Sequence, residues 1–285
     1  MTETIRTIDA LRSRLAWSRM RGRTIGLVPT MGALHAGHAA LLDRARAEND
    51  VVVVTLFVNP TQFNEAGDLA AYPRTLQADQ GVCNQAGVDI LFAPDEHEIY
   101  PREPHTTIEV SGLASGLCGA HRPGHFRGVA TVVAKLLLIA QPDRAYFGEK
   151  DFQQLAIIRR MVADLNFPVE IVGVATVREP DGLALSSRNR LLTAGRRKAA
   201  PAIFEGLRSA QALAAQGETD SAKLRAVALA PIELEPELQV EYVEIVDPES
   251  LEPVKRLAGE ARIAAAVRAG PVRLIDNVAL QPASQ

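Results

Sequence analysis

The sequence predicts an α/β protein with a doubly wound parallel sheet and a smaller C-terminal domain. Up to about residue 176, β-branched apolar runs alternate with helical patterns, which is typical of a parallel sheet covered by helices. Polar clusters directly follow several of these runs, where the ligands of such sheets bind. After residue 176, Ala-rich helical segments precede strand-like runs, which favours an α+β unit. We therefore expect a Rossmann-like domain over residues 1–176 and an α+β domain over 177–285, with the hinge placed to within about four residues.

The elements of the first domain follow from hydrophobic periodicity and from Gly and Pro punctuation. Residues 51–58 are apolar except for Thr55, which suits a parallel strand buried on both faces. Residues 64–73 are polar and are interpreted as a mobile loop, and a short strand is expected at 106–110 within the proline-rich stretch 93–124. The other expected elements are helix 8–20, strand 24–28, turn 29–32, a helix from about His35 to 47, helix 74–86, strand 88–92, helix 126–140, strand 144–147, helix 152–164 and strand 169–174.

The second domain is expected to contain two helices followed by a small sheet. A turn-rich loop over 181–189 leads into it. The expected elements are helices 193–215 and 219–229 and strands 238–246, 262–267 and 272–275.

Composition excludes several classes of protein. A chain of 285 residues with 47% hydrophobic and 23% charged residues can build a sizeable core. The net charge of −3 gives no strong field for nucleic acid or an anionic membrane, so neither is an expected partner. Cys83 and Cys118 lack metal-ligand spacing, which argues against a zinc site or a disulfide framework. Neither a signal peptide nor an apolar run of ~20 residues is present, so we expect a cytoplasmic protein.

Residues 24–38 predict a nucleotide phosphate site. A buried strand is followed by a Pro-Thr-Met-Gly turn and a helix start, whose free N–H groups and positive dipole end suit a phosphate. His35 and His38 share one face there and can donate hydrogen bonds to phosphoryl oxygens, with added stabilisation in a protonated form. Gly37 lacks a Cβ, so a ligand can approach the backbone closely. For an isolated histidine, capping or core packing would be the better interpretation.

Other polar groups follow later strands and extend this prediction. Lys150 heads a helix at a strand end, and Ser186, Ser187 and Arg188 offer hydroxyls and a bidentate cation for β- and γ-phosphates. For Lys150 alone a solvated surface charge would be the better interpretation, and for Ser186 to Arg188 a loop with an ordinary surface arginine is equally common. No GxGxxG follows the first strand and no GxxxxGK[ST] occurs, so dinucleotide-binding and P-loop interpretations lose their main support.

Four further features keep two interpretations each. Gln62 and Gln154 can orient a hydroxylated or carboxylate substrate, although many glutamines are simply exposed. Asp79 can hold Mg²⁺ with nucleotide phosphates or lie on a helix surface. A basic group is formed by His121, Arg122, His125 and Arg127. It could bind an anionic substrate or stabilise a subunit contact, and it is about equally consistent with a solvated loop.

With these residues in view, the chain resembles the pantoate–β-alanine ligases of the HxGH nucleotidyltransferase superfamily. An ordered series of motifs across most of the chain carries the resemblance. They are VPTMGALHAGH (28–38), FVNPTQF (57–63), YPRT (72–75), HRPGHFRGV (121–129), YFGEKDFQQ (146–154) and DGLALSSRN (181–189). HxGH alone would indicate only the superfamily, whereas the series is specific.

The resemblance implies that ATP, (R)-pantoate and β-alanine give pantothenate, AMP and pyrophosphate through pantoyl adenylate. It implies catalytic roles for His38, commonly the proton donor, and for His35, Lys150 and Arg188. Gln62 and Gln154 would hold pantoate, Gln62 would also lie near β-alanine, and Asp79 matches a Mg²⁺-linked position. Homodimers are implied. The implied ATP-binding residues are Met31, Gly32, Ala33, Leu34, His35, Ala36, Gly37, His38, Gly148, Glu149, Lys150, Asp151, Val177, Leu185, Ser186, Ser187 and Arg188.

Three alternatives predict different properties. Another HxGH enzyme that transfers a nucleotidyl group to a phosphate would need extra cations in place of the glutamines. A tRNA-binding synthetase fragment would need a basic surface, against which the net charge counts. A non-catalytic nucleotide sensor would not need the full set of cations.

Overall fold

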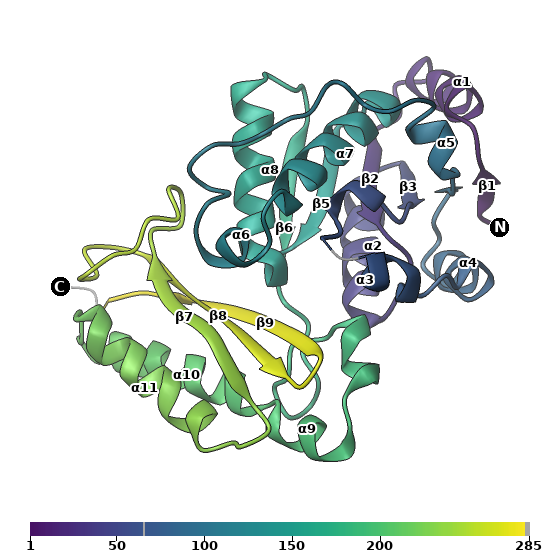
Figure 1. Cartoon of the computed structure of the whole chain (residues 1–285). Helices are drawn as coiled ribbons and strands as arrows, with labels where there is room; N and C mark the ends of the chain where they lie inside the picture. Colours follow the sequence, from purple (N-terminus) through teal and green to yellow (C-terminus); the bar gives the residue numbers. More distant parts are fainter. Residues whose placement is uncertain (65, 283–285) are drawn as a thin grey trace.

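The larger domain is built on a six-stranded parallel sheet, confirming the predicted fold class. The computed structural model describes residues 1–64 and 66–282. The strand order is β1-β4-β3-β2-β5-β6, and every pairing is parallel (Figure 1). The chain runs outward from β2 to β3 and β4, and then returns to the other side of β2 for β5 and β6. The carboxyl ends of β2 and β5 therefore flank the point where the winding reverses, which is where such sheets bind ligands. The strands are β1 (Glu3–Ile5), β2 (Ile25–Thr30), β3 (Val51–Leu56), β4 (Ile90–Phe92), β5 (Arg144–Gly148) and β6 (Glu170–Val174).

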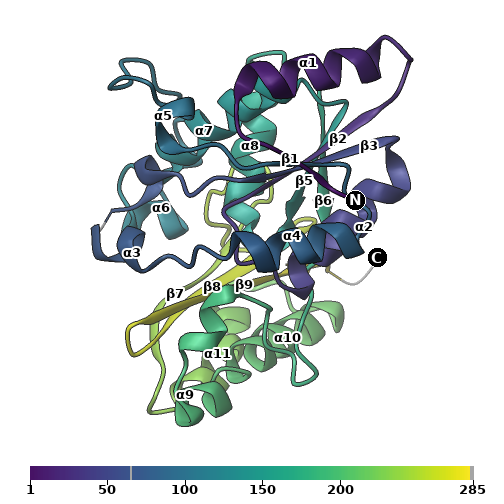
Figure 2. The ribbon, with the colours of Figure 1, turned by 90° about the vertical axis from the view of Figure 1, so that its right-hand side faces the viewer.

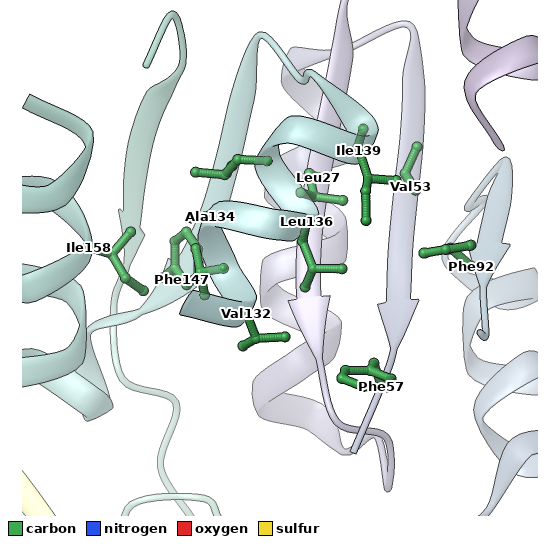
Figure 3. Close-up of a cluster of buried hydrophobic side chains, with 14 of the residues drawn as sticks. Leu27, Val53, Phe57, Phe92, Val132, Ala134, Leu136, Ile139, Phe147 and Ile158 are labelled. Carbon is green, nitrogen blue, oxygen red and sulfur yellow. The ribbon is translucent and has the colours of Figure 1, made fainter. Parts of the chain in front are cut away.

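Helices bury both faces of this sheet, which explains why its strands are apolar on successive residues. Leu27 of β2 and Val53 of β3 lie beside Leu136 and Ile139 of α7 (Figure 3). Their neighbours Val28, Val52 and Val54 face the opposite side and pack in a second apolar cluster with α2. The helices of this domain are α1 (Ile8–Arg19), α2 (Ala36–Glu48), α3 (Ala66–Ala71), α4 (Leu76–Gln85), α5 (Glu96–Ile99), α6 (Leu117–His121), α7 (His125–Ala140) and α8 (Phe152–Asp164), with short 3-10 turns η1 (Pro60–Gln62) and η2 (Glu149–Asp151).

The smaller domain packs two helices on one face of an antiparallel sheet of order β7-β8-β9 (Figure 2). Its other face carries Tyr242 and Ala264, which pack with Leu117 and Phe152 of the larger domain. An apolar contact therefore joins the two domains. The elements are η3 (Ser187–Leu191), α9 (Ala194–Ala199), α10 (Ala202–Ala215), α11 (Ser221–Glu233), β7 (Gln239–Val246), β8 (Ala261–Ala269) and β9 (Val272–Leu280). The predicted boundary at residues 176/177 stays a prediction.

Several local predictions were wrong. Residues 106–110 form no strand, and α3 lies within 64–73, where we expected only a loop. The predicted helix 193–215 is two helices, because Pro201 follows α9 and cannot donate a backbone hydrogen bond. Strand β2 continues through Thr30, beyond the expected turn at Pro29, and β1 had not been predicted. None of the helices in the described ranges is both long and apolar enough to span a membrane.

Candidate active site

The two histidines of the HxGH motif lie at the start of α2, directly beyond the carboxyl end of β2. His35 is the N-cap of the helix rather than part of it, and its Nδ1 accepts a hydrogen bond from the Gly37 N–H at 3.1 Å. Nδ1 of His38 accepts a hydrogen bond from the backbone N–H of His35 at 3.2 Å. The two ring centroids are 4.2 Å apart. Each imidazole is thus fixed through Nδ1, which leaves its Nε2 for a ligand.

Both imidazoles are neutral near pH 7. Burial lowers the pKa of His38 to about 3, and the neighbouring His35 adds to the shift. Burial also lowers the pKa of His35, with further contributions from Lys150 and Arg190. Because Nδ1 is an acceptor in both rings, the proton sits on Nε2. The site therefore offers two neutral N–H donors, not the charged form considered from the sequence.

Gly37 lines the cavity and has a second role beside the one predicted. A Cβ on this residue would lie 2.9 Å from Cε1 of His35 and 3.0 Å from its Nδ1. Glycine is therefore needed so that the His35 ring can fold over the helix start, whether or not a ligand is bound.

Asp79 stabilises the turn that leads into the motif. Its Oδ1 accepts a hydrogen bond from the Leu34 N–H at 2.7 Å, and its Oδ2 accepts from the Ala33 N–H at 3.1 Å and the Thr75 hydroxyl at 3.0 Å. Gly32 and Ala33 have positive φ angles of 91° and 52°, which is costly for Ala33. Asp79 is only 2% exposed. Its carboxylate is committed to protein donors, so this geometry does not fit the predicted contact with Mg²⁺.

Gln62 is held at both its backbone and its side chain. Nδ2 of Asn59 donates to its Oε1 at 3.0 Å, and its Nε2 contacts Sδ of Met31 at 3.2 Å. Nδ1 of His125 donates to its backbone carbonyl at 2.8 Å, and Arg122 donates to the same oxygen at 3.3 Å. The predicted basic group therefore contributes two residues that hold Gln62.

His125 is a neutral imidazole with its proton on Nδ1. Its Nδ1 must donate to a carbonyl, so Nε2 accepts from Arg122 at 3.1 Å. Burial, followed by the charge of Arg122, lowers the pKa of His125 to about 4. Helix α7 can approach this turn because Gly128 has no side chain: a Cβ there would lie 2.4 Å from the Thr61 carbonyl oxygen. The turn and the helix form one rigid support for Gln62.

Most of the predicted residues converge on one cavity of about 250 Å³ between the two domains. Lys150 is 19% exposed at its side chain and lies 3.8 Å from the Asp151 carboxylate. Six of the predicted set do not line this cavity: Gly32, Ala33, Leu34, Ala36, Asp79 and Glu149. Those that do are Met31, His35, Gly37, His38, Gln62, Gly148, Lys150, Asp151, Gln154, Val177, Leu185, Ser186, Ser187 and Arg188.

Comparison with known proteins identifies the family. The family model described as pantoate-beta-alanine ligase matches residues 3–279. The chain belongs to the pantoate–β-alanine ligase family. It is 53% identical to the pantothenate synthetase of Heliobacterium modesticaldum, covering 97% of this chain and all of that protein. It is 54% identical to the pantothenate synthetase of Sinorhizobium medicae, covering 99% of this chain and 97% of that protein.

Solved structures agree with this family assignment. Pantothenate synthetase from Thermus thermophilus superposes with a TM-score of 0.93 at 48% identity, covering 99% of this chain and 100% of that one. A pantoate-beta-alanine ligase from Francisella tularensis, complexed with beta-gamma ATP and β-alanine, gives 0.81 at 38% identity, covering 98% and 97%. The protein is therefore an enzyme of the ligase class.

Three residues of this ligase's site are missing from the set predicted from the sequence. Asn59 is 1% exposed and bridges Gln62 and the Gly128 carbonyl. It lies in the polar cluster after β3, so its position was visible but its partners were not. Tyr72 also lines the cavity. Asn277 donates to the carbonyls of Glu149 and Lys150 from the far end of the chain, and nothing in the sequence pattern indicated this contact.

Proposed function

We propose that this protein joins (R)-pantoate and β-alanine in an ATP-dependent reaction that passes through pantoyl adenylate. A pantoate carboxylate oxygen attacks the α-phosphorus of ATP, and the bond from that phosphorus to the β-phosphate oxygen breaks, which releases pyrophosphate. The nitrogen of β-alanine then attacks the acyl carbon and loses a proton. The acyl–oxygen bond breaks, and AMP leaves with the bonding pair.

The observation that carries this proposal is the convergence of the histidine pair, Lys150, Arg188 and the two glutamines on one cavity. A free carboxylate is a poor acyl donor, so amide formation needs an activated acid. In-line displacement at phosphorus needs positioned donors and cations more than a protein nucleophile. The neutral Nε2–H groups of His35 and His38 would stabilise the charge that develops on the α-phosphate. Lys150 and Arg188 would bind the outer phosphates.

Gln62 and Gln154 favour a carboxylate acceptor over a phosphorylated one. Both are uncharged, and the amide of Gln62 is already oriented by Asn59 and Met31. A nucleotidyltransferase that acts on a phosphate would place cations at these positions. The preformed orientation of Gln62 reduces the entropy lost when pantoate binds.

Mg²⁺ would accompany ATP rather than occupy a cage built by the protein. Among the described residues, no group of three His, Cys, Asp or Glu side chains could hold a metal ion. The Asp79 carboxylate already accepts three hydrogen bonds. Mg²⁺ commonly binds nucleotide phosphates with few protein ligands, so neither observation conflicts with MgATP as the substrate.

Isotope exchange between pyrophosphate and ATP tests the proposal. Exchange should require pantoate and should proceed without β-alanine, because the adenylate forms before the amine enters. Absence of pantoate-dependent exchange in an enzyme that makes pantothenate would reject the adenylate. Absence of pantoate-dependent pyrophosphate release would favour the alternative nucleotidyltransferase.

The homodimer implied by the family resemblance is also a proposal. Light scattering at several protein concentrations would test it, and a mass equal to one chain at all concentrations would reject it.

A further inference from the structure

Asn277 of β9 connects the smaller domain to the loop that carries Lys150. Its Nδ2 donates to the carbonyl oxygens of Glu149 at 2.9 Å and Lys150 at 3.0 Å. Its Oδ1 accepts from Nη1 of Arg262 at 3.2 Å. Asn277 is 5% exposed, so its three polar contacts are made out of solvent. All the hydrogen-bonding groups of this amide are therefore committed to one geometry, apart from a second lone pair on Oδ1.

The preceding residue fixes Asn277 in place. Asp276 is 4% exposed and forms a bidentate ion pair with Arg178, at 2.5 and 3.0 Å. Oδ1 of Asp276 also accepts from the backbone N–H of Asn277 at 2.7 Å. A buried, bidentate pair of this kind restricts both partners. The amide of Asn277 is thus presented from a rigid point of the sheet.

The same strand reaches both segments predicted to bind phosphate. Asn277 holds the 149–151 turn, and Arg178, paired with Asp276, donates to the Gly182 carbonyl at 3.1 Å. Residue 182 lies in the loop that leads to Ser186 and Arg188. Two consecutive residues of β9 therefore support the segments that carry the two cations of the site, Asn277 directly and Asp276 through Arg178.

We propose that Asn277 is a positioning residue that fixes the Lys150 backbone, so that the Lys150 ammonium meets the ATP phosphates when β9 of the smaller domain is docked. This inference rests on the proposed role of Lys150 in binding ATP. Without the two hydrogen bonds, the 149–151 turn would lose its link to the smaller domain, and the lysine would lose part of its preorganisation.

A double-mutant cycle on ATP binding tests the inference. Dissociation constants for ATP are measured by calorimetry, without pantoate, for the wild type, Asn277→Ala, Lys150→Ala and the double variant. We expect Asn277→Ala to weaken ATP binding about tenfold and Lys150→Ala to weaken it more, in line with a charge-assisted contact. In the Lys150→Ala background, Asn277→Ala should change the constant less than about twofold, because residues that act through one another are not additive.

Asn277→Asp provides a second arm of the cycle in case the alanine variant does not fold. It preserves shape and the Arg262 contact but places an acceptor against two carbonyl oxygens, so it should weaken ATP binding at least as much. Gln211→Ala is the matched control. It also removes a hydrogen bond between a side-chain amide and β9, because Nε2 of Gln211 donates to the Ala279 carbonyl oxygen at 2.7 Å. It should leave ATP binding unchanged, and pantoate binding should be unchanged in every Asn277 variant.

The outcomes separate the inference from the proposed function. If Lys150→Ala weakens ATP binding and the Asn277 effect is undiminished in that background, Asn277 does not act through Lys150 and the inference is overturned. If Asn277→Ala and Asn277→Asp both bind ATP like the wild type, it is equally overturned. If Lys150→Ala itself leaves ATP binding unchanged, the proposed role of Lys150 fails, and the inference fails with it.

Discussion

The backbone N–H of His35 donates a hydrogen bond to Nδ1 of His38, so the first histidine of the motif sets the protonation of the second. The proton of His38 is confined to Nε2, the only ring nitrogen free for a ligand. His35 is oriented in turn by the Gly37 N–H. The spacing of HxGH thereby places two hydrogen-bond donors at a single helix start.

Replacing His38 by Ala should lower kcat by roughly 10²–10³-fold, since one positioned hydrogen-bond donor to a developing negative charge contributes about that much. The reason is loss of the Nε2–H group that would contact the α-phosphate. Initial-rate measurements of pantothenate formation test this, with circular dichroism confirming the fold. Wild-type turnover in a folded variant would contradict the role.

Replacing Gln62 by Ala should raise the KM for pantoate on the order of tenfold or more, because the acceptor carboxylate or hydroxyl loses a hydrogen bond in a buried site. ATP binding, measured by calorimetry, should remain within about twofold, as expected for a residue outside the phosphate site. An unchanged KM and kcat for pantoate would reject this assignment.

His125→Ala should affect pantoate use in the same direction as Gln62→Ala, because the Gln62 carbonyl loses the donor 2.8 Å away. His125→Gln is the matched variant, since its amide can donate to Gln62 and accept from Arg122. We expect the glutamine variant to recover most of the pantoate affinity. Equal pantoate KM values for the two variants would show that the hydrogen bond is unimportant.

Acidification should destabilise the protein between about pH 6.5 and 4. Folding lowers the pKa of His38 to about 3 and of His125 to about 4, whereas unfolded histidine titrates near 6.5. Below pH 6.5 the unfolded state therefore binds more protons. The stabilisation is complete above that pH and is lost as pH falls toward the folded values, by roughly 1–3 kcal/mol for each group.

Urea unfolding at a series of pH values measures this loss. His125→Gln, which cannot titrate, should have a shallower dependence of unfolding free energy on pH than the wild type. Identical slopes in the two proteins would show that His125 contributes nothing to acid sensitivity.

Asp79→Asn should reduce activity without changing the Mg²⁺ concentration needed for half-maximal rate. The asparagine keeps the shape but turns one acceptor into a donor that faces the N–H groups of Ala33 or Leu34, or the Thr75 hydroxyl. A cost of about 1–3 kcal/mol in stability is expected from the unpaired group. A shifted Mg²⁺ requirement with unchanged stability would instead support a metal contact.

The sequence was sufficient for the large sheet because burial on both faces produces unbroken apolar runs. It was insufficient for β1, a three-residue edge strand that depends on its pairing with β4. Residues 106–110 have the alternation of a strand, yet the Ile108 N–H donates to the Thr131 hydroxyl of α7 at 2.9 Å. The hydroxyl of Thr131 on α7 thus accepts the hydrogen bond that a neighbouring strand would have accepted. The local sequence pattern of residues 106–110 does not indicate this partner.

The same distinction holds for the site. Lys150 and the histidines follow the ends of β5 and β2, so the topology of the sheet brings them together, and Arg188 of η3 joins them from the loop after β6. Asn277 contacts Lys150 across 127 positions of sequence, and Asp79 contacts Ala33 across 46. These supporting contacts depend on how two domains and a helix dock, which short motifs do not encode.

The smaller domain has one packed core, around α10 and α11, and the larger domain has two, one on each face of the parallel sheet. A small apolar contact joins the two domains. Heat does not have to melt any of these cores to stop the reaction. Loosening that contact would separate β9 from the loops that it supports while most of the secondary structure survives. Thermal inactivation should therefore precede loss of the circular dichroism signal. The contact between the two domains, and not any of the cores, would then limit how long the enzyme stays active on heating.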